Sequence, residues 1–214
     1  MGGCYLPAMK RSVAIGYRQS FLLASMAERQ AALWLPIGVG AVDASYWYRG
    51  SSDYHEQRLE AGYGLPLASW LSASVVLAYL NVGTADPHYP SQHWLAADAM
   101  VVAALSSALS FTLNAGSRPW DKERPWRAML QMVYRYHGGW TTVLQADSEE
   151  RLRLRAGVEY LYQQQLAVRA GLSTAPLALT FGTGLVVGAW RFDLSVEAHS
   201  RLGVSPHTTL TLCF

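Results

Sequence analysis

The sequence predicts an all-β fold, namely a closed antiparallel transmembrane β-barrel of about 14 strands (12–14) formed by a single domain over residues 1–214. Segments of alternating apolar and polar residues recur along the chain, and the last of them ends in the aromatic Phe214. Charged residues make up only 15% of the sequence, whereas soluble domains contain about 25%. This shortage indicates that much of the surface does not face water.

Residues 190–199 have the most regular alternation in the chain. Successive side chains of a strand point to opposite faces, so one face of this segment is apolar and the other is mostly ionisable. We expect the apolar face to contact lipid and the ionisable face to line the lumen. The two sets are Trp190, Phe192, Leu194, Val196 and Ala198, alternating with Arg191, Asp193, Ser195, Glu197 and His199.

Similar segments, separated by turn signals, predict strands of about 9–11 residues, the length that crosses a bilayer when tilted. The predicted strands are 12–20, 21–35, 39–49, 54–65, 70–82, 94–105, 108–116, 126–137, 140–147, 152–162, 165–173, 177–187, 190–199 and 206–214. Residues 21–30 could instead form a helix, because Leu, Ala, Met, Glu, Arg and Gln favour one. The long polar links 83–92 and 117–125 are expected outside the cell, as in other outer-membrane barrels.

Three features favour a membrane barrel over a soluble β-sandwich, which also alternates apolar and polar residues. The charge content is low, Lys10 and Lys122 are the only lysines, and aromatic residues gather near strand ends. The most apolar stretch, 99–105, is too short for a transmembrane helix, so a closed barrel is the remaining way to span a bilayer. The aromatic residues expected in interfacial girdles are Tyr46, Trp47, Tyr48, Tyr63, Tyr79, Trp94, Trp126, Tyr160, Tyr162 and Trp190.

The expected location is the bacterial outer membrane, although no signal peptide is visible in residues 1–11. Phe214 is the candidate barrel-closing C-terminal signal that the assembly machinery reads. Cys4 and Cys213 are too few for a disulfide framework.

The motifs of the second half resemble a known family. They are Arg169-Ala170-Gly171, the Thr180-Phe181-Gly182-Thr183-Gly184-Leu185 segment and the final stretch from His199 to Phe214, together with the tyrosine and glycine rhythm of 46–65 and the loop after Asn114. They are similar to PorV/PorQ-type proteins of the FadL-like outer-membrane barrels. The resemblance implies a 14-stranded barrel. Its relatives include transporters of hydrophobic compounds and partner subunits of larger secretion or barrel-assembly machines. The stretch before Ser12 is short for the N-terminal plug of those transporters.

The sequence favours a non-enzymatic protein without cofactors or metal. The six histidines have neither the helical spacing nor the Cys/His clustering of a metal site. His199 and Ser200 are adjacent in a predicted strand and so face opposite sides, which is unsuitable for a nucleophile and its base. The net charge of +2 is too small to indicate nucleic-acid binding.

The ionisable face of the predicted barrel is a candidate lumen charge network. Charges in a narrow lumen must be paired and hydrogen-bonded, so we favour an interlocked plug over an open ion-conducting pore. The predicted network comprises Arg153, Arg155, Glu159, Arg169, Arg191, Asp193 and Glu197, with Arg49, Arg58, Arg135, Asp43 and Glu60 expected on the same face.

We therefore expect an accessory subunit of a larger outer-membrane complex for protein secretion or outer-membrane protein assembly. The alternative is a FadL-like channel or transporter for a small hydrophobic compound. The expected partners are membrane lipid or lipopolysaccharide and another outer-membrane protein, and no nucleic acid. Trp120 in the 117–125 link and Trp126 directly after it are candidate anchors for the protein partner, because Trp is common at interface hot spots. Equally, both could lie at the membrane interface.

Overall fold

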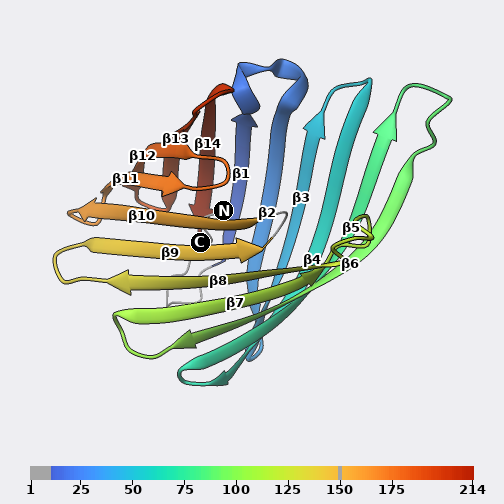
Figure 1. The fold of residues 1–214 in the computed structure, drawn as a ribbon. Helices are drawn as coiled ribbons and strands as arrows, with labels where there is room; N and C mark the ends of the chain where they lie inside the picture. Colours follow the sequence, from blue (N-terminus) through green and yellow to red (C-terminus); the bar gives the residue numbers. More distant parts are fainter. Residues whose placement is uncertain (1–10, 149–150) are drawn as a thin grey trace.

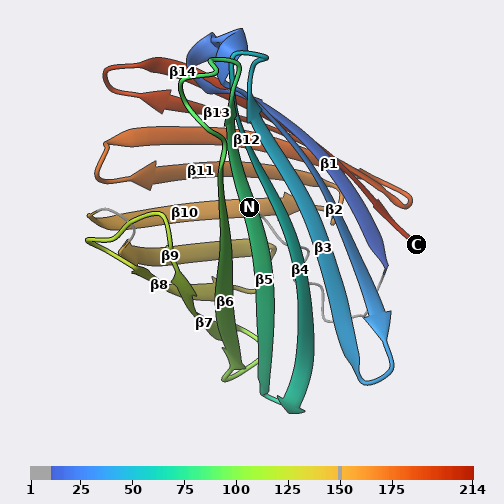
Figure 2. The same ribbon diagram turned by 90° about the vertical axis from the view of Figure 1, so that its right-hand side faces the viewer.

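The computed structural model describes residues 11–148 and 151–214. These residues form a closed barrel of 14 antiparallel strands (Figures 1 and 2), so the predicted fold class is confirmed. No helix in this described part of the chain is long and apolar enough to cross a bilayer. Cys4 and the rest of residues 1–10, where no signal peptide is visible in the sequence, lie outside the described ranges.

The strands follow one another around the barrel in chain order, and each pairs with its two neighbours. Their bounds are β1 Ser12–Gln19, β2 Ala27–Ile37, β3 Gly40–Gly50, β4 Tyr54–Ala68, β5 Leu71–Thr84, β6 Gln92–Ala104, β7 Leu109–Ser117, β8 Trp126–Arg135, β9 Trp140–Ser148, β10 Leu152–Tyr162, β11 Leu166–Ser173, β12 Ala178–Val187, β13 Trp190–His199 and β14 Gly203–Cys213. Strands β1–β6 in one wall cross the direction of strands β8–β13 in the other (Figure 1), as expected for strands tilted around a barrel.

The first and last strands close the barrel. They pair from Ser12↔Cys213 to Arg18↔His207 without interruption. Beyond this ladder, the Phe214 amide donates to the carbonyl of Arg11 at 2.9 Å. The terminal aromatic residue is therefore tied into the closing seam, with its side chain exposed.

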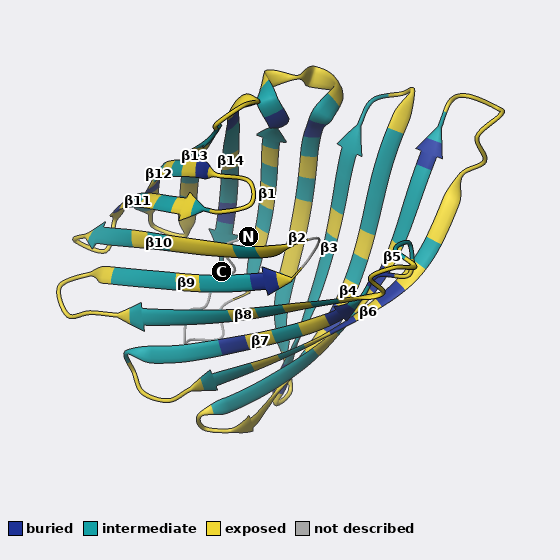
Figure 3. Cartoon of the chain, viewed as in Figure 1, coloured by how far each residue is buried: buried dark blue, intermediate teal, exposed yellow. Residues whose placement is uncertain are grey.

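The apolar face of the barrel points outward. In β13, Trp190, Phe192, Leu194 and Val196 are 38–50% exposed, while Arg191 and its polar neighbours lie on the inner face. Exposed and less exposed residues alternate in this way along most strands (Figure 3), and few residues are fully buried. This pattern suits a protein whose large apolar side chains are covered by lipid instead of by a protein core.

The lengths of the connections orient the barrel in the membrane. The end where β1 begins and β14 ends has the short turns 38–39, 69–70, 105–108, 136–139, 163–165 and 188–189. The longer links 20–26, 85–91 and 118–125 all lie at the opposite end. Because outer-membrane barrels have short periplasmic turns and longer extracellular loops, we assign the end with the short turns to the periplasm. The two long links predicted from the sequence then lie outside the cell.

The segment 21–26 differs from the sequence prediction, because it is neither strand nor α-helix. It forms two short 3-10 turns, Ser20–Leu22 and Ala24–Met26. Phe21 has a φ of 55°, and its amide donates to the Ser205 hydroxyl at 2.9 Å. This tertiary hydrogen bond to β14 fixes the turn, and local propensity alone could not reveal it. β14 also begins earlier than predicted, at Gly203, because Pro206 is accommodated within the strand.

Two of the aromatic residues expected in the interfacial girdles lie elsewhere. Trp47 shares the inner face of β3 with Asp43 and Ser45, and Trp94 shares the inner face of β6 with Asp98. Both side chains point toward the lumen because of their parity in the strand. A tryptophan near a strand end indicates depth in the membrane, but not which face of the sheet it occupies.

Because Leu194 faces lipid, a charged side chain at this position should lower the stability of the barrel by an amount that depends on its depth in the membrane. The substitution Leu194→Arg should destabilise the barrel by about 2–4 kcal/mol, the cost of Arg on the lipid face near mid-membrane. Urea unfolding from phospholipid vesicles, followed by tryptophan fluorescence, would measure this cost. The matched control is Ser195→Arg, which puts the same side chain into the lumen beside Asp193 and Glu197. Equal destabilisation by both substitutions would contradict the assigned facing.

Candidate functional site

The candidate functional site is the inner face of the barrel, where nearly all charged residues of the strands lie. Within the described strands, Arg29 is the one charge on the outer face, and its guanidinium lies 5.9 Å from the centre of the Tyr48 ring. The remaining basic and acidic residues are equal in number, so the inner face is balanced in formal charge. They are Arg18, Arg49, Arg58, Arg127, Arg135, Arg153, Arg155, Arg169 and Arg191, with Glu28, Asp43, Glu56, Glu60, Asp98, Asp147, Glu159, Asp193 and Glu197.

Four residues of the predicted network form one connected cluster on β10, β11 and β13. Arg169 donates through Nε to Glu159 Oε2 at 2.5 Å and through Nη1 to Asp193 Oδ1 at 2.6 Å. Arg191 Nε donates to the other oxygen of Asp193 at 2.8 Å. Arg169 is therefore the centre of the cluster, because it joins carboxylates on both sides of β12.

The other three predicted residues have different partners. Arg155 forms an ion pair with Asp147 on β9 at 3.4 Å, and Arg153 Nε donates to the Ala175 carbonyl at 3.2 Å. Glu197 pairs across β14 with Arg18 at 3.3 Å. The structure thus distributes the predicted network among several local interactions instead of one interlocked set.

A second cluster, centred on Asp98, was not singled out from the sequence. Arg127 contacts both oxygens of Asp98 at 2.8 Å, and Arg58 Nη2 donates to Oδ2 at 3.1 Å. Arg58 also pairs with Glu60 at 2.6 Å, and Ser45 donates to Glu60 at 2.7 Å. Asp98 is the only charged residue in the otherwise apolar stretch 94–105. A lone charge in an apolar segment is the sequence feature that could have identified it as a structural or functional residue.

Glycines on the intervening strands make room for both clusters. Gly116 on β7 lies in register between Asp98 and Arg127, and a Cβ there would collide with Asp98 Oδ1. Gly184 on β12 is in register with Asp193, and a Cβ there would lie 2.5 Å from Asp193 Oδ1 and 3.0 Å from Arg169 Nη2. The charged side chains therefore reach across a strand that carries no side chain at that point.

These ion pairs run along the barrel wall. Each joins residues on the same strand, on adjacent strands or on strands separated by one other. Apart from Asp98 and Asp147, the side chains involved are 20–43% exposed. Such pairs line the lumen instead of bridging it, which is not the arrangement expected of an interlocked plug.

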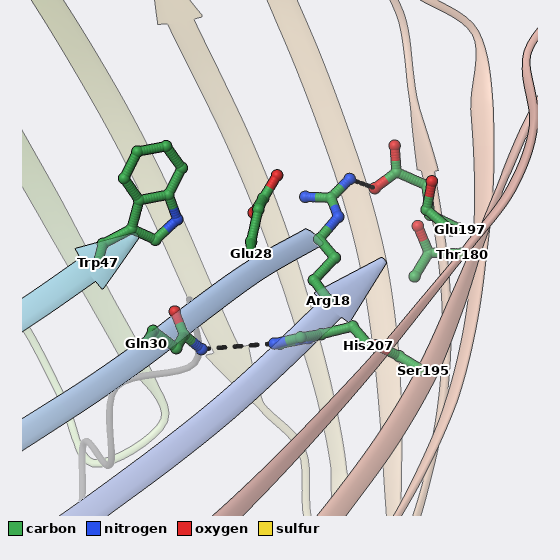
Figure 4. Close-up of a pocket in the computed structure, with 9 residues that line it drawn as sticks. Arg18, Glu28, Gln30, Trp47, Thr180, Ser195, Glu197 and His207 are labelled. Atoms are coloured by element: carbon green, nitrogen blue, oxygen red, sulfur yellow. Dashed lines mark hydrogen bonds and ion pairs between the residues drawn. The ribbon is translucent and has the colours of Figure 1, made fainter. Parts of the chain in front are cut away.

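A polar cavity of about 240 Å³ lies near the extracellular end of the inner face. Its lining comes from β1, β2, β3, β12, β13 and β14 (Figure 4). Across the cavity, Gln30 Nε2 and His207 Nε2 are 3.4 Å apart. The 20–26 segment adjoins this region, because Ser20 donates to Glu28 and the Phe21 amide to Ser205. The residues are Arg18, Glu28, Gln30, Trp47, Thr180, Ser195, Glu197, Ser205 and His207.

The two candidate anchor tryptophans lie in different environments. Trp120 packs edge-on against the inner-face Trp94, with ring centres 6.5 Å apart, and its ring lies 5.8 Å from the Arg118 guanidinium. Trp126 is 71% exposed on the outer face at the extracellular end of β8. Trp126 is thus placed for contact with lipid or a partner, whereas Trp120 helps to hold its own loop.

The histidines of the described ranges 11–148 and 151–214 belong to no candidate metal site. There, no group of three or more His, Cys, Asp or Glu residues could hold a metal ion. His199 Nδ1 accepts hydrogen bonds from the amides of Arg201 and Leu202, both at 3.2 Å. His199 therefore stabilises the β13–β14 turn, and its Nδ1 is occupied by these two hydrogen bonds.

Comparison with solved structures finds bacterial outer-membrane barrels. The CymD monoaromatic hydrocarbon channel gives a TM-score of 0.72 at 8% identity, over 96% of this chain and 88% of that chain. The Pseudomonas putida toluene transporter TodX gives 0.67 at 10% identity, over 98% and 89%. The KdgM porin gives 0.58 at 10% identity, over 95% and 99%.

The protein is an outer-membrane β-barrel. The predicted location is therefore confirmed. No family model matches the sequence, and no curated protein matches it. At 8–11% identity the likeness to the solved barrels concerns their fold, so the PorV/PorQ-type resemblance stays a prediction.

The Asp98 cluster predicts a measurable loss of stability on neutralisation. Asp98→Asn should destabilise the barrel by about 1.5–3 kcal/mol, because Arg58 and Arg127 lose charge-assisted hydrogen bonds. Urea unfolding from vesicles would measure the change. The control is Asp53→Asn in the exposed 51–53 turn, which should stay within about 0.5 kcal/mol of the unaltered protein. An Asp98 variant as stable as the control would contradict a structural role for the cluster.

Proposed function

We propose that the protein is a passive channel for small water-soluble solutes across the outer membrane. The observation that carries the proposal is the inner face, which is polar, balanced in charge and lined by ion pairs along the wall. Partly exposed charges of this kind keep their hydration in a wide lumen. The lumen of a 14-stranded barrel is wider than that of an eight-stranded one, which side chains fill.

Ala32 supports a lumen with room for solutes. It faces inward on β2, because its register partners Ala14 and Ser45 both lie on the inner face. Even so, Ala32 is an exposed residue. An exposed side chain on the inner face indicates space beside it, and a hydrated passage would use such space.

Balanced charge indicates weak discrimination between ions. A lumen lined by one sign of charge concentrates counter-ions and excludes co-ions. Here acidic and basic residues are interleaved along the same wall, as in the Glu159, Arg169, Asp193 and Arg191 cluster. We therefore propose a channel that selects mainly by size, with little preference for cations or anions.

Transport of a small hydrophobic compound is the second candidate, supported by the similarity in fold to CymD, a monoaromatic hydrocarbon channel, and to TodX, a toluene transporter. It would use an apolar passage and an opening toward lipid beside an irregular strand. The β4–β5 register is interrupted between Pro66 and Ala68, near the periplasmic end. The charged inner face is the reason to prefer water-soluble solutes.

The accessory-subunit hypothesis stays a prediction. The comparisons favour a channel over a secretion or assembly subunit, and the position of Trp120 against Trp94 removes one candidate anchor from the outer surface. Trp126 is the remaining anchor for another outer-membrane protein or for lipopolysaccharide. The absence of an enzymatic activity is part of the same proposal.

Planar-bilayer recording tests the proposal. The purified protein should give ohmic conductance with a cation-to-anion permeability ratio close to one, because the lumen charges balance. Ala32→Trp should lower the single-channel conductance, since its side chain enters the lumen.

The matched control is Ala31→Trp, one residue away, whose partners Ile15 and Tyr46 place it on the lipid face. Its conductance should be unchanged. Absence of conductance, together with uptake of toluene by vesicles that contain the protein, would replace the proposal with the hydrophobic-transport candidate.

A further inference from the structure

The cavity at the extracellular end contains a carboxylate, that of Glu28, without an ion-pair partner among the described residues. Glu28 lies in register with Arg18 on β1 and with Arg49 on β3. Arg18 turns away and pairs with Glu197, two strands distant, at 3.3 Å. Among the described residues, no guanidinium lies within 4 Å of the Glu28 carboxylate, whose Oε1 accepts from the Ser20 hydroxyl at 3.1 Å. The negative charge of Glu28 is therefore available to a ligand.

Trp47 lies on the side of Glu28 opposite Arg18. Figure 4 shows the indole ring and the Glu28 carboxylate lining the same cavity from neighbouring strands. A cation is attracted both by a carboxylate and by the face of a tryptophan ring, the strongest of the aromatic rings in this respect. A charged pole and an aromatic pole in one small cavity suit a cationic group of modest size.

The rest of the lining supplies neutral hydrogen-bonding groups. Thr180, Ser195 and Ser205 contribute hydroxyls, and Gln30 and His207 contribute an amide and an imidazole. Formal charge in the lining is net negative, because Arg18 is opposed by both Glu28 and Glu197. An anion would meet this excess negative charge, whereas an ammonium group would relieve it.

We propose that this cavity binds the ammonium group of small organic cations, with the charge between the Glu28 carboxylate and the Trp47 ring. The proposal rests on the channel function, in which the cavity is a stopping point near the extracellular mouth. A lumen that is balanced overall would thus hold one local site of cation preference. Solutes that carry an ammonium group and hydroxyl or amide groups would use both parts of the lining.

Binding can be measured without transport. Butylammonium, butanol and butyrate have the same chain and differ in charge, so they separate charge recognition from apolar contact. Saturation-transfer NMR with the protein in detergent micelles should show butylammonium binding, with butanol weaker and butyrate weakest. Equal binding of the three probes would overturn the proposal.

Substitutions distinguish binding at this cavity from attraction by the overall charge of the lumen. Glu28→Gln should weaken butylammonium binding roughly tenfold, and Trp47→Leu should weaken it about threefold. Glu28→Asp keeps the charge and should restore most of the affinity. The matched control is Glu56→Gln, which removes the same charge from the inner face but lies outside the cavity lining. Equal losses in the Glu28 and Glu56 variants would overturn a local site.

The outcomes distinguish this site from the channel function. Butylammonium should also shorten open-channel currents in bilayers, and Glu28→Gln should remove this block. If the barrel binds butylammonium in micelles but conducts nothing, the channel proposal fails and the site stands. If it conducts but does not prefer butylammonium, the site fails alone.

Discussion

Closure of the sheet is the constraint on which the rest of this structure depends. In the hydrocarbon region of a bilayer, each backbone amide and carbonyl needs a partner within the protein, because no water can replace it. The uninterrupted β1–β14 ladder, extended by the bond between Phe214 and Arg11, satisfies the two strands that would otherwise be edges. With closure complete, every strand has one face toward lipid and one toward the lumen, and the residue type at each position follows from that division.

The inner face carries charges that closure brings together. Arg169 links Glu159 and Asp193 across β12, and Asp98 links Arg58 and Arg127 across β5 and β7. Such pairs are effective because they keep part of their hydration and form short hydrogen bonds. A side chain on the strand between them would obstruct the contact, which is why glycine stands at 116 and 184. The barrel wall is thus braced from the inside without a packed core.

The same arrangement shapes the proposed function. Charges that are paired along the wall leave the lumen polar yet balanced, which favours passage of small solutes over accumulation of one ion. At the extracellular end the pairing changes, because Arg18 is directed to Glu197 and leaves Glu28 beside Trp47. The 20–26 segment supports this departure, since Ser20 holds the Glu28 carboxylate and Phe21 is tied to Ser205.

The sequence by itself determined the all-β class, the lipid and lumen faces of strands such as β13, and the ionisable inner wall. These features follow from the alternation of apolar and polar residues along each strand, which can be read from neighbouring residues alone. Only the tertiary structure decided which charges meet. Asp98 finds Arg58 and Arg127, and Glu197 finds Arg18, through registers between strands that sequence order alone does not give. The tertiary structure also decided that Trp47 and Trp94 face inward and that the 20–26 segment is held against β14 by the hydrogen bond from Phe21 to Ser205. Pairing depends on register and closure, which are properties of the whole sheet and of no single segment.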